Sequence, residues 1–273
     1  MTDLVVRRLL VDLETPFAMR WNGGDAFRSA LFNALSMSFP VGEQFFIDSV
    51  RAGLKALPEE KRAAFEKEVQ GFVAQEATHR RIHANFNAQL DRLGFNNTWE
   101  PRSAKRIAAN AWRSVRFHVG STAAVEHFTA ILSAWIFRHP EVFEGSEPRL
   151  ITLWQWHAAE EAEHRSTAFD MFRALDGSEE TRRQVFRIVT TIFLSNLVRQ
   201  TIRNLWDDNS LFKWSTWRSA VQVLFSKDGM FRGNIGPWRE YLAADFHPTK
   251  QAAPHAQAWL GAHSDQYAVV SGA

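Results

Sequence analysis

The sequence predicts an all-α protein, a four-helix bundle followed by additional helices. Apolar residues recur at every third or fourth position over long stretches, as they do on the buried face of a helix. No stretch alternates apolar and polar residues between hairpin turns, which is the pattern expected of strands. Four of the predicted helices carry glutamates, two of them within Glu-x-x-His segments, among apolar neighbours, and this is typical of bundles with a metal site in their core.

The first two predicted helices are separated by a clear start signal. The first runs over 25–57 and contains Pro40, which we expect to kink it or split it in two, with Glu43 near the start of the second piece. The next opens on a proline followed by two acidic residues and runs over 58–93. Gly94 then supplies a C-terminal stop.

Three further long helices follow. One runs from about Arg102 to near His139, where a proline follows, and another covers about 148–176. Ser178, with two acidic residues after it, then caps a helix that continues to about Trp206. We expect the bundle that carries the ligands to be complete before this last helix.

The sequence contains no Gly/Ser tract or proline-rich linker, so we expect one domain. It would cover residues 1–247, with a core bundle at about 25–177 and extra helices, rich in Trp and Phe, at about 178–247. Residues 248–273 are rich in Ala, His and Gln and only weakly patterned, and they predict a weakly structured tail.

The composition restricts the kind of metal site. The 273 residues include no cysteine, which excludes disulfides, iron–sulfur clusters and thiolate zinc sites. A metal in this chain must therefore be held by oxygen and by imidazole nitrogen. That ligand set suits iron, manganese or zinc better than magnesium or calcium.

The charge pattern excludes some partners. A net charge of +2 does not indicate a nucleic-acid partner. Residues 1–15 do not resemble a signal peptide, and the most apolar stretch, 188–198, is too short to span a bilayer, so we expect a cytoplasmic protein. Long exposed helices favour a homodimer.

One predicted helix carries a basic stripe, which is either a solvated face or a surface for an acidic redox partner or an anionic substrate. Its residues are Arg102, Lys105, Arg106, Arg113 and Arg116.

The strongest functional signal is a repeated pattern of a lone glutamate followed by Glu-x-x-His. Glu43 precedes Glu76-Ala77-Thr78-His79 by 33 residues, and Glu126 precedes Glu161-Ala162-Glu163-His164 by 35. Residues three apart on a helix lie about 60° apart around its axis, so each Glu and His of a motif project into the same interior. Four buried carboxylates would repel one another strongly, whereas two divalent cations would neutralise them. The pattern therefore predicts a two-metal centre.

Two more histidines lie near the same helix faces. His83 and His157 are each either an additional metal ligand or a group bonded to a ligand. We expect Glu160, Glu163 and His127 to point away from the ligands, although Glu160 would approach the site if its helix unwinds locally. Without a metal, the acidic groups would instead pair with nearby arginines, which are Arg80, Arg81 and Arg165.

With these motifs, the chain resembles a bacterial family of predicted metal-dependent hydrolases, a ferritin-like helical group. The resemblance covers most of the chain, and the matching segments are 39–46 (FPVGEQFF), 75–79 with His83 and Asn87, Glu126-His127, 157–164 (HAAEEAEH), 168–170, Tyr241-Leu242 and 246–248. It implies a metal site at Glu43, Glu76, His79, Glu126, Glu161 and His164, with His83 and His157 as additions. The extra histidines also resemble those of ferritin-like arylamine N-oxygenases, on ligand count alone.

Three functions are compatible with such a centre. The first is a di-iron enzyme that uses O2 to oxidise or oxygenate an apolar or aromatic small molecule. The second is a hydrolase in which two zinc or manganese ions activate a bridging water to hydroxide, with Glu160 or His157 as acid or base. The third is non-catalytic metal binding, for iron storage or structure, which the long aromatic C-terminal region disfavours.

Overall fold

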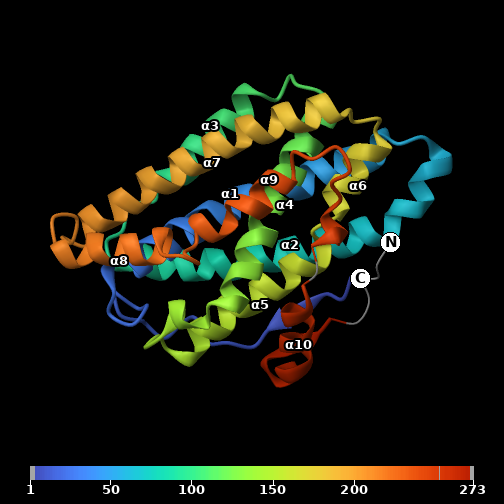
Figure 1. Cartoon of the computed structure of the whole chain (residues 1–273). Helices are drawn as coiled ribbons and strands as arrows, with labels where there is room; N and C mark the ends of the chain where they lie inside the picture. Colours follow the sequence, from blue (N-terminus) through green and yellow to red (C-terminus); the bar gives the residue numbers. More distant parts are fainter. Residues whose placement is uncertain (1–3, 252, 271–273) are drawn as a thin grey trace.

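The computed structural model describes residues 4–251 and 253–270, and these are predominantly helical (Figure 1). The all-α prediction is confirmed. Within the described residues, strands occur only as a short antiparallel pair. Strand β1 (Arg7–Leu9) pairs with β2 (Tyr267–Val269), with Arg7 opposite Val269. The pair joins the two ends of the described chain.

Four helices form the bundle that carries the predicted ligands: α1 (Ala26–Ala56), α2 (Glu59–Arg92), α4 (Val115–Arg138) and α5 (Pro148–His164). The carboxylate of Asp25 caps α1 by accepting a hydrogen bond from the backbone of Arg28, and Ser114 caps α4 in the same way. Helix α1 packs mainly against α2, and α4 packs against both α1 and α5. Two apolar clusters form the core around this bundle.

Helix α1 continues through Pro40 and is not split there. A proline inside a helix leaves the carbonyl four residues earlier without its usual N–H partner. Here that carbonyl belongs to Ser36, and the side chain of Asn87 on α2 donates a hydrogen bond to it at 3.0 Å. The freed acceptor is therefore satisfied by the neighbouring helix, which explains why the proline is tolerated.

Two of the long predicted helices are each divided. The segment expected from Arg102 to His139 forms α3 (Trp99–Ala109) and then α4, since the turn between them ends in the Ser114 cap. The segment expected over 148–176 breaks directly after His164, and α6 (Thr167–Ala174) follows. The hydroxyl of Thr167 donates to Glu68 on α2 at 2.9 Å, and this contact helps to fix the start of α6. The basic stripe therefore lies on two helices and the turn between them.

The remaining helices cover the bundle (Figure 1). Helix α7 (Glu179–Asp207) agrees with the prediction, and the side chain of Ser178 caps it. The others are α8 (Trp214–Phe225), α9 (Ile235–Glu240), α10 (Pro254–Ala262) and the short 3-10 segments η1 (Pro140–Phe143), η2 (Arg232–Asn234), η3 (Pro248–Lys250) and η4 (Ser264–Gln266).

The segment after residue 247 is more ordered in its described part than the sequence predicts. It contains α10 and β2, and it buries Trp259 and Leu260. The indole of Trp259 donates to Gln155 of α5 at 3.0 Å. Contacts with a distant helix, which local sequence patterns do not reveal, therefore order this region.

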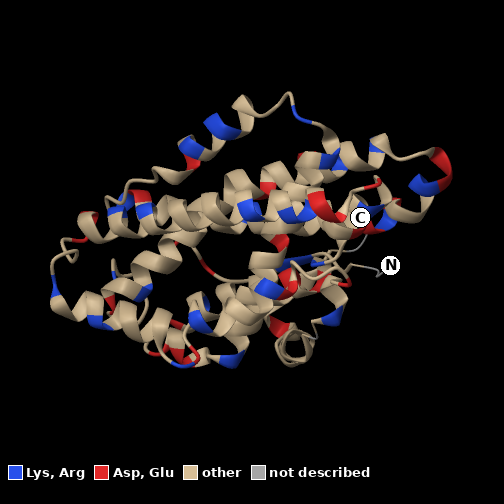
Figure 2. Cartoon of the chain, turned by 45° about the horizontal axis from the view of Figure 1, so that its top comes forward, with Lys and Arg blue, Asp and Glu red and all other residues tan. Residues whose placement is uncertain are grey.

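Most charged residues in the described chain are exposed or partly exposed. Basic residues mark α3 and the turn after it (Figure 2). Among the helices in the described part of the chain, none combines the length and the apolar character needed to cross a membrane.

Candidate metal centre

The structure brings all eight predicted ligand residues into the centre of the bundle. Helix α1 supplies one, α2 three, α4 one and α5 three, and none exposes more than 4 % of its surface: Glu43, Glu76, His79, His83, Glu126, His157, Glu161 and His164. Glutamate side chains, which make up four of the eight, are almost never fully buried unless they are paired or hold a metal. The prediction that these residues converge is therefore met, and their role as ligands stays a prediction.

The first set of donor atoms, called group A here, comprises Glu76, Glu126, Glu161 and His164. One donor atom from each lies within 4.8 Å of all the others. The Nε2 atom of His164 lies 3.2 Å from Glu76 Oε1, 3.3 Å from Glu126 Oε2 and 3.4 Å from Glu161 Oε2. Three carboxylates thus face one imidazole nitrogen. Together they form a compact cluster of oxygen and nitrogen atoms that could bind a metal ion.

The second set, group B, comprises Glu43, His79 and His157, again with donor atoms within 4.8 Å of one another. Glu161 lies between the two groups. Its Oε1 atom is 2.9 Å from His157 Nε2 and 3.4 Å from His79 Nδ1, whereas its Oε2 atom faces His164 of group A. One carboxylate thus offers an oxygen to each group, as a carboxylate bridging two metals would.

The hydrogen bonding of these atoms tests whether metal ions fit. Among the described residues, both carboxylate oxygens of Glu43, Glu76 and Glu126 lack a hydrogen-bond partner although they are buried. The same holds for Oε2 of Glu161 and Nε2 of His164, whose contacts with one another are close but do not have hydrogen-bond geometry. Unpaired buried carboxylates are costly, and two divalent cations would supply both the missing partners and the missing charge. The residues fit a pair of metal ions.

The pKa values of the carboxylates reflect this crowding. Burial, followed by the charge of Glu76, raises the pKa of Glu43 well above its usual range. Burial also raises the pKa of Glu126 to about 8, although the charge of His164 acts against it. The pKa of Glu161 is lowered instead: burial would raise it, but the charge of His164 and hydrogen bonding to His157 outweigh burial. Glu161 is therefore the carboxylate most readily ionised.

The four histidines divide into two pairs. Burial disfavours the charged form of all of them, yet a hydrogen bond to Glu160 raises the pKa of His79 to about 10, and the charge of Glu126 raises that of His164. In contrast, burial and then the charge of His79 lower the pKa of His157 to about 4, and burial and then the charge of His157 lower that of His83. The histidines of the two Glu-x-x-His motifs thus face the negative charge of the cluster most directly.

A hydrogen-bonded chain behind the cluster orients both motif histidines. Nε2 of His79 lies 2.9 Å from Glu160, and Nδ1 of His164 lies 2.9 Å from the amide oxygen of Gln75, which accepts its proton. Each histidine therefore turns its other nitrogen toward the carboxylates. A carboxylate or amide behind a ligating imidazole is a common arrangement, because it fixes the ring and its tautomer.

Arg7 connects the two ends of this series of hydrogen bonds. It donates from Nη1 to Glu160 at 3.2 Å and to Glu163 at 2.7 Å, and Glu163 also accepts a hydrogen bond from Gln75 at 3.0 Å. The sequence does not reveal Arg7 as part of the site, because it is 153 residues from Glu160 and lies on β1. Gln75 could have been identified from the sequence, because it directly precedes the Glu-x-x-His motif in the segment that resembles the family.

Glu160 differs from the expectation that it points away from the ligands. It is fully buried and binds His79, while its second oxygen binds Arg7. Glu160 lies one residue before Glu161 near the end of α5, and its side chain reaches His79 of α2. Both Glu160 oxygens are occupied, so the geometry favours an orienting role over the predicted acid or base role. His127 lies away from the cluster, 3.0 Å from the carbonyl of Pro237.

His83 is next to the cluster but outside both groups. Its Nε2 lies 2.6 Å from Nδ1 of His157, and its Nδ1 lies 2.9 Å from the hydroxyl of Ser36. Both ring nitrogens are therefore engaged, whereas Nε2 of His157 faces Glu161. The geometry distinguishes the two surplus histidines: His157 lies within group B, whereas His83 contacts His157 from outside the group.

The arginines that would pair with the acidic groups in a metal-free site do not do so. Arg80 donates to Gln44, and Arg165 donates to backbone carbonyls, including that of Pro248 at 3.3 Å. Within the described part of the chain, neither they nor Arg81 form an ion pair with the cluster. The cation on this cluster's periphery is Arg7 instead.

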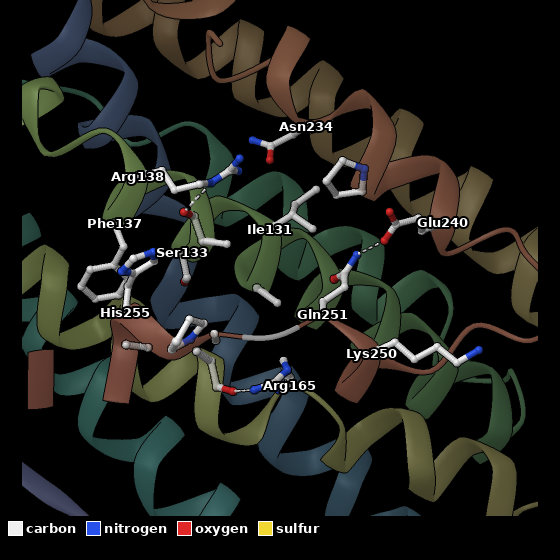
Figure 3. A pocket seen from close by; sticks show the side chains of 17 residues that line it. Ile131, Ser133, Phe137, Arg138, Arg165, Asn234, Glu240, Lys250, Gln251 and His255 are labelled. Atoms are coloured by element: carbon white, nitrogen blue, oxygen red, sulfur yellow. Dashed lines mark hydrogen bonds between the residues drawn. The ribbon is translucent and has the colours of Figure 1, made fainter. Parts of the chain in front are cut away.

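Two cavities adjoin the bundle. One, of about 240 Å³, lies between α1, α3, α4 and α7 and is lined mainly by apolar side chains. The other, of about 510 Å³, lies between α4, the end of α5, and segments near α9 and α10 (Figure 3). Several of its polar groups have partners within the protein: Gln251 donates to Glu240 at 2.8 Å, and Arg138 and Arg165 each donate to a carbonyl.

Comparison with known proteins agrees with a metal centre. A family model described as predicted metal-dependent hydrolase matches residues 5–252, which is nearly the whole chain and includes every residue of groups A and B. No curated protein and no solved structure matches the chain. The chain belongs to the family of predicted metal-dependent hydrolases.

Proposed function

We propose that this protein is a two-metal enzyme with a ferritin-like bundle, in which group A holds one ion and group B the other. The observation that carries the proposal is the position of Glu161, with one oxygen toward each group. The four carboxylates of the two groups carry a charge of about −4 when ionised, which two divalent cations neutralise. Oxygen and nitrogen donors without sulfur suit iron, and also manganese or zinc.

We propose oxidation or oxygenation of an apolar small molecule by O2 as the reaction. A pair of bound iron ions would supply the electrons for reducing O2. The chain's own residues support such chemistry by position: Glu160 and Gln75 hold the protons of His79 and His164 on the outer nitrogens. The aromatic rings of Phe39 and Trp156, which pack against the histidines, exclude bulk water from the inner side. A redox partner protein would deliver the electrons.

Hydrolysis is the second candidate, and the description of the family favours it. A pair of bound zinc or manganese ions would activate water as Lewis acids. The apolar lining of the 240 Å³ pocket fits an oxidisable hydrocarbon group better than a polar ester or amide, and this is why we place oxidation first.

Metal analysis of protein purified without added metal tests the proposal. We expect two ions per chain, with iron predominant. The iron-loaded protein, reduced without air and then mixed with O2, should consume O2. Absence of O2 uptake with any reductant would contradict oxidation. Ester or amide turnover that does not depend on O2, with zinc or manganese bound, would instead establish the hydrolase.

A pair of variants on α5 tests the ligand assignment. Glu161→Ala should lose at least one metal ion, because it removes the carboxylate shared by groups A and B. Glu163→Ala, two residues later, should retain two ions with an affinity lower by about 10- to 100-fold, since it only supports Arg7 and Gln75 behind the histidines. Equal loss of metal from both variants would mean that the assignment is wrong.

A further inference from the structure

The 240 Å³ pocket is apolar over most of its surface and has a basic end. Aromatic and aliphatic side chains from α1, α3, α4 and α7 line it, among them the buried Phe39, Phe46 and Trp99. Among the described residues, no aspartate or glutamate lines it, whereas Arg106 and Arg113 do. A ligand that fills this pocket therefore has a hydrocarbon body, and any charge it carries is negative.

The pocket shares a wall with the metal centre. Gly42 and Val125, which line it, directly precede Glu43 and Glu126 in the chain. The ring of Phe39, also in the lining, lies 4.7 Å from the ring of His157. A molecule bound in the pocket would thus extend from the surface at α3 toward the side chains of groups A and B.

Within the part of the chain that the structure describes, Arg106 is a cation without an anionic partner. It is partly exposed on α3, and among residues 4–251 and 253–270 its guanidinium has no hydrogen-bond or ion-pair partner. Its surroundings are positive: burial and then the charges of Arg199 and Arg106 lower the pKa of Arg102. Arg113, in contrast, donates to Asn110 and stacks on Phe117, so it is already engaged. Arg106 is the group in this lining that is free to bind a carboxylate.

We infer that this pocket binds a medium-sized apolar carboxylic acid, with its carboxylate at Arg106 and its hydrocarbon part toward Glu43 and Glu126. The planar guanidinium matches a carboxylate in geometry as well as in charge. The volume of 240 Å³ lies between a cavity of about 150 Å³, which holds one benzene, and the lower limit of about 300 Å³ for drug-sized ligands. The inference rests on the proposed function, because it names the substrate class of that two-metal site.

Calorimetric titration of the full chain, with its metal content determined, tests the inference. Octanoate and octan-1-ol are suitable probes, since they share a hydrocarbon chain and differ in charge. We expect octanoate to bind about tenfold more tightly than the alcohol, because a hydrogen bond to a charged group contributes on that order. Arg106→Gln should remove this difference.

Lys105→Gln is the matched control. It removes the same charge from the neighbouring position of α3, but Lys105 is exposed and does not line the pocket. Its octanoate affinity should stay within about twofold of the parent, since only long-range, screened electrostatics change. Equal binding of octanoate and octan-1-ol by the parent, or an unchanged preference in Arg106→Gln, would overturn the inference.

A second variant tests the location independently of charge. Gly42 lines the pocket, and an added Cβ there would meet only Phe46, itself a lining residue, at 3.7 Å, so Gly42→Leu can be accommodated. It should abolish octanoate binding, whereas Gly261→Leu on α10, where an added Cβ meets nothing within 4 Å, should not. Octanoate binding retained in Gly42→Leu would place the acid elsewhere.

The two proposals fail in different ways. Octanoate binding does not require turnover, so the preference for the acid can be measured whether or not the iron-loaded protein consumes O2. If O2 uptake and two metal ions are found but the preference for octanoate is absent, only the assignment of the pocket is wrong. If the protein prefers octanoate but metal analysis finds that it binds no metal ions, the two-metal proposal is wrong and the acid site remains.

Discussion

Two of the groups of buried polar side chains in this protein differ in how fully their hydrogen bonds are satisfied. On α7, Gln200 donates to Asn96 and Asn204 and accepts hydrogen bonds from Thr98, while Asn204 donates to the carbonyl of Ala30. Every one of these contacts is a regular hydrogen bond. In groups A and B, by contrast, most carboxylate oxygens lack a partner in the described chain. A polar network that only supports the fold satisfies itself, whereas a binding site leaves its donor atoms unpaired.

The largest expected effect that separates the two regions is that of metal removal. The metal-loaded protein should be more stable than the metal-free protein by about 4 kcal/mol with free metal at about 1,000 times its dissociation constant. The reason is that cations bind the folded cluster and not the unfolded chain. Urea unfolding with and without a chelator measures the difference. An unchanged midpoint would mean that groups A and B do not bind metal.

Gln200→Ala should destabilise the protein by about 1 to 3 kcal/mol, because it leaves several buried partners unsatisfied. The loss should be the same in the metal-free and the metal-loaded protein, and two metal ions should still bind. Unfolding experiments on both forms provide the measurement. A loss that appears only in the metal-loaded form would couple this network to the metal centre and remove the contrast between the two regions.

Glu43→Gln should reduce metal binding without destabilising the metal-free protein, which is the opposite of what we expect for Gln200→Ala. The buried carboxylate of Glu43 has no hydrogen-bond partner and its pKa is raised, so a neutral amide of the same shape should leave the stability of the metal-free protein unchanged or increase it by about 1 kcal/mol. Metal bound by group B should decrease, because one of its three donors is lost. Metal analysis together with unfolding of the metal-free variant checks both parts. Strong destabilisation without metal would show that Glu43 supports the fold.

The pH dependence of stability sharpens the contrast further. The pKa values of Glu126, about 8, and His79, about 10, are raised in the folded state, so both groups keep protons that the unfolded chain has lost. The stability of the metal-free protein should therefore fall between pH 6.5 and 8, by about 1.4 kcal/mol per pH unit for each retained proton. Below pH 6.5, His157 acts with the opposite sign, because its pKa is lowered to about 4.

Unfolding of the metal-free protein at pH 6.5 and pH 8 measures this slope. In the metal-loaded protein, the cations replace the protons, so that metal affinity should increase with pH and offset the loss. The Gln200 network contains no titratable group and should not contribute. A metal-free protein that is more stable at pH 8 than at pH 6.5 would contradict the crowding of carboxylates in group A.

The positions of the candidate ligand residues could be predicted, whereas their surroundings could not. The spacing within each Glu-x-x-His motif predicts that both side chains share a helix face, and His79 and His164 do face the carboxylates. The difference between His83 and His157 was left open, because both lie near the same face of their helices. It depends on Ser36, which belongs to another helix.

The sequence by itself determined that the chain is helical and which helix faces carry the acidic and imidazole groups, since both follow from periodicity over neighbouring residues. Only the tertiary structure decided which oxygen of Glu161 faces which histidine and which nitrogen of each histidine faces inward. It also placed Arg7 of β1 where it completes the series of hydrogen bonds behind the histidines. It also decided that Pro40 stays within one helix, through the side chain of Asn87. His157 and His164 lie within four residues of Glu161, but the contacts that fix the inward nitrogens, Arg7 and Pro40 join residues 51 or more apart. Local patterns carry no information about such distant partners.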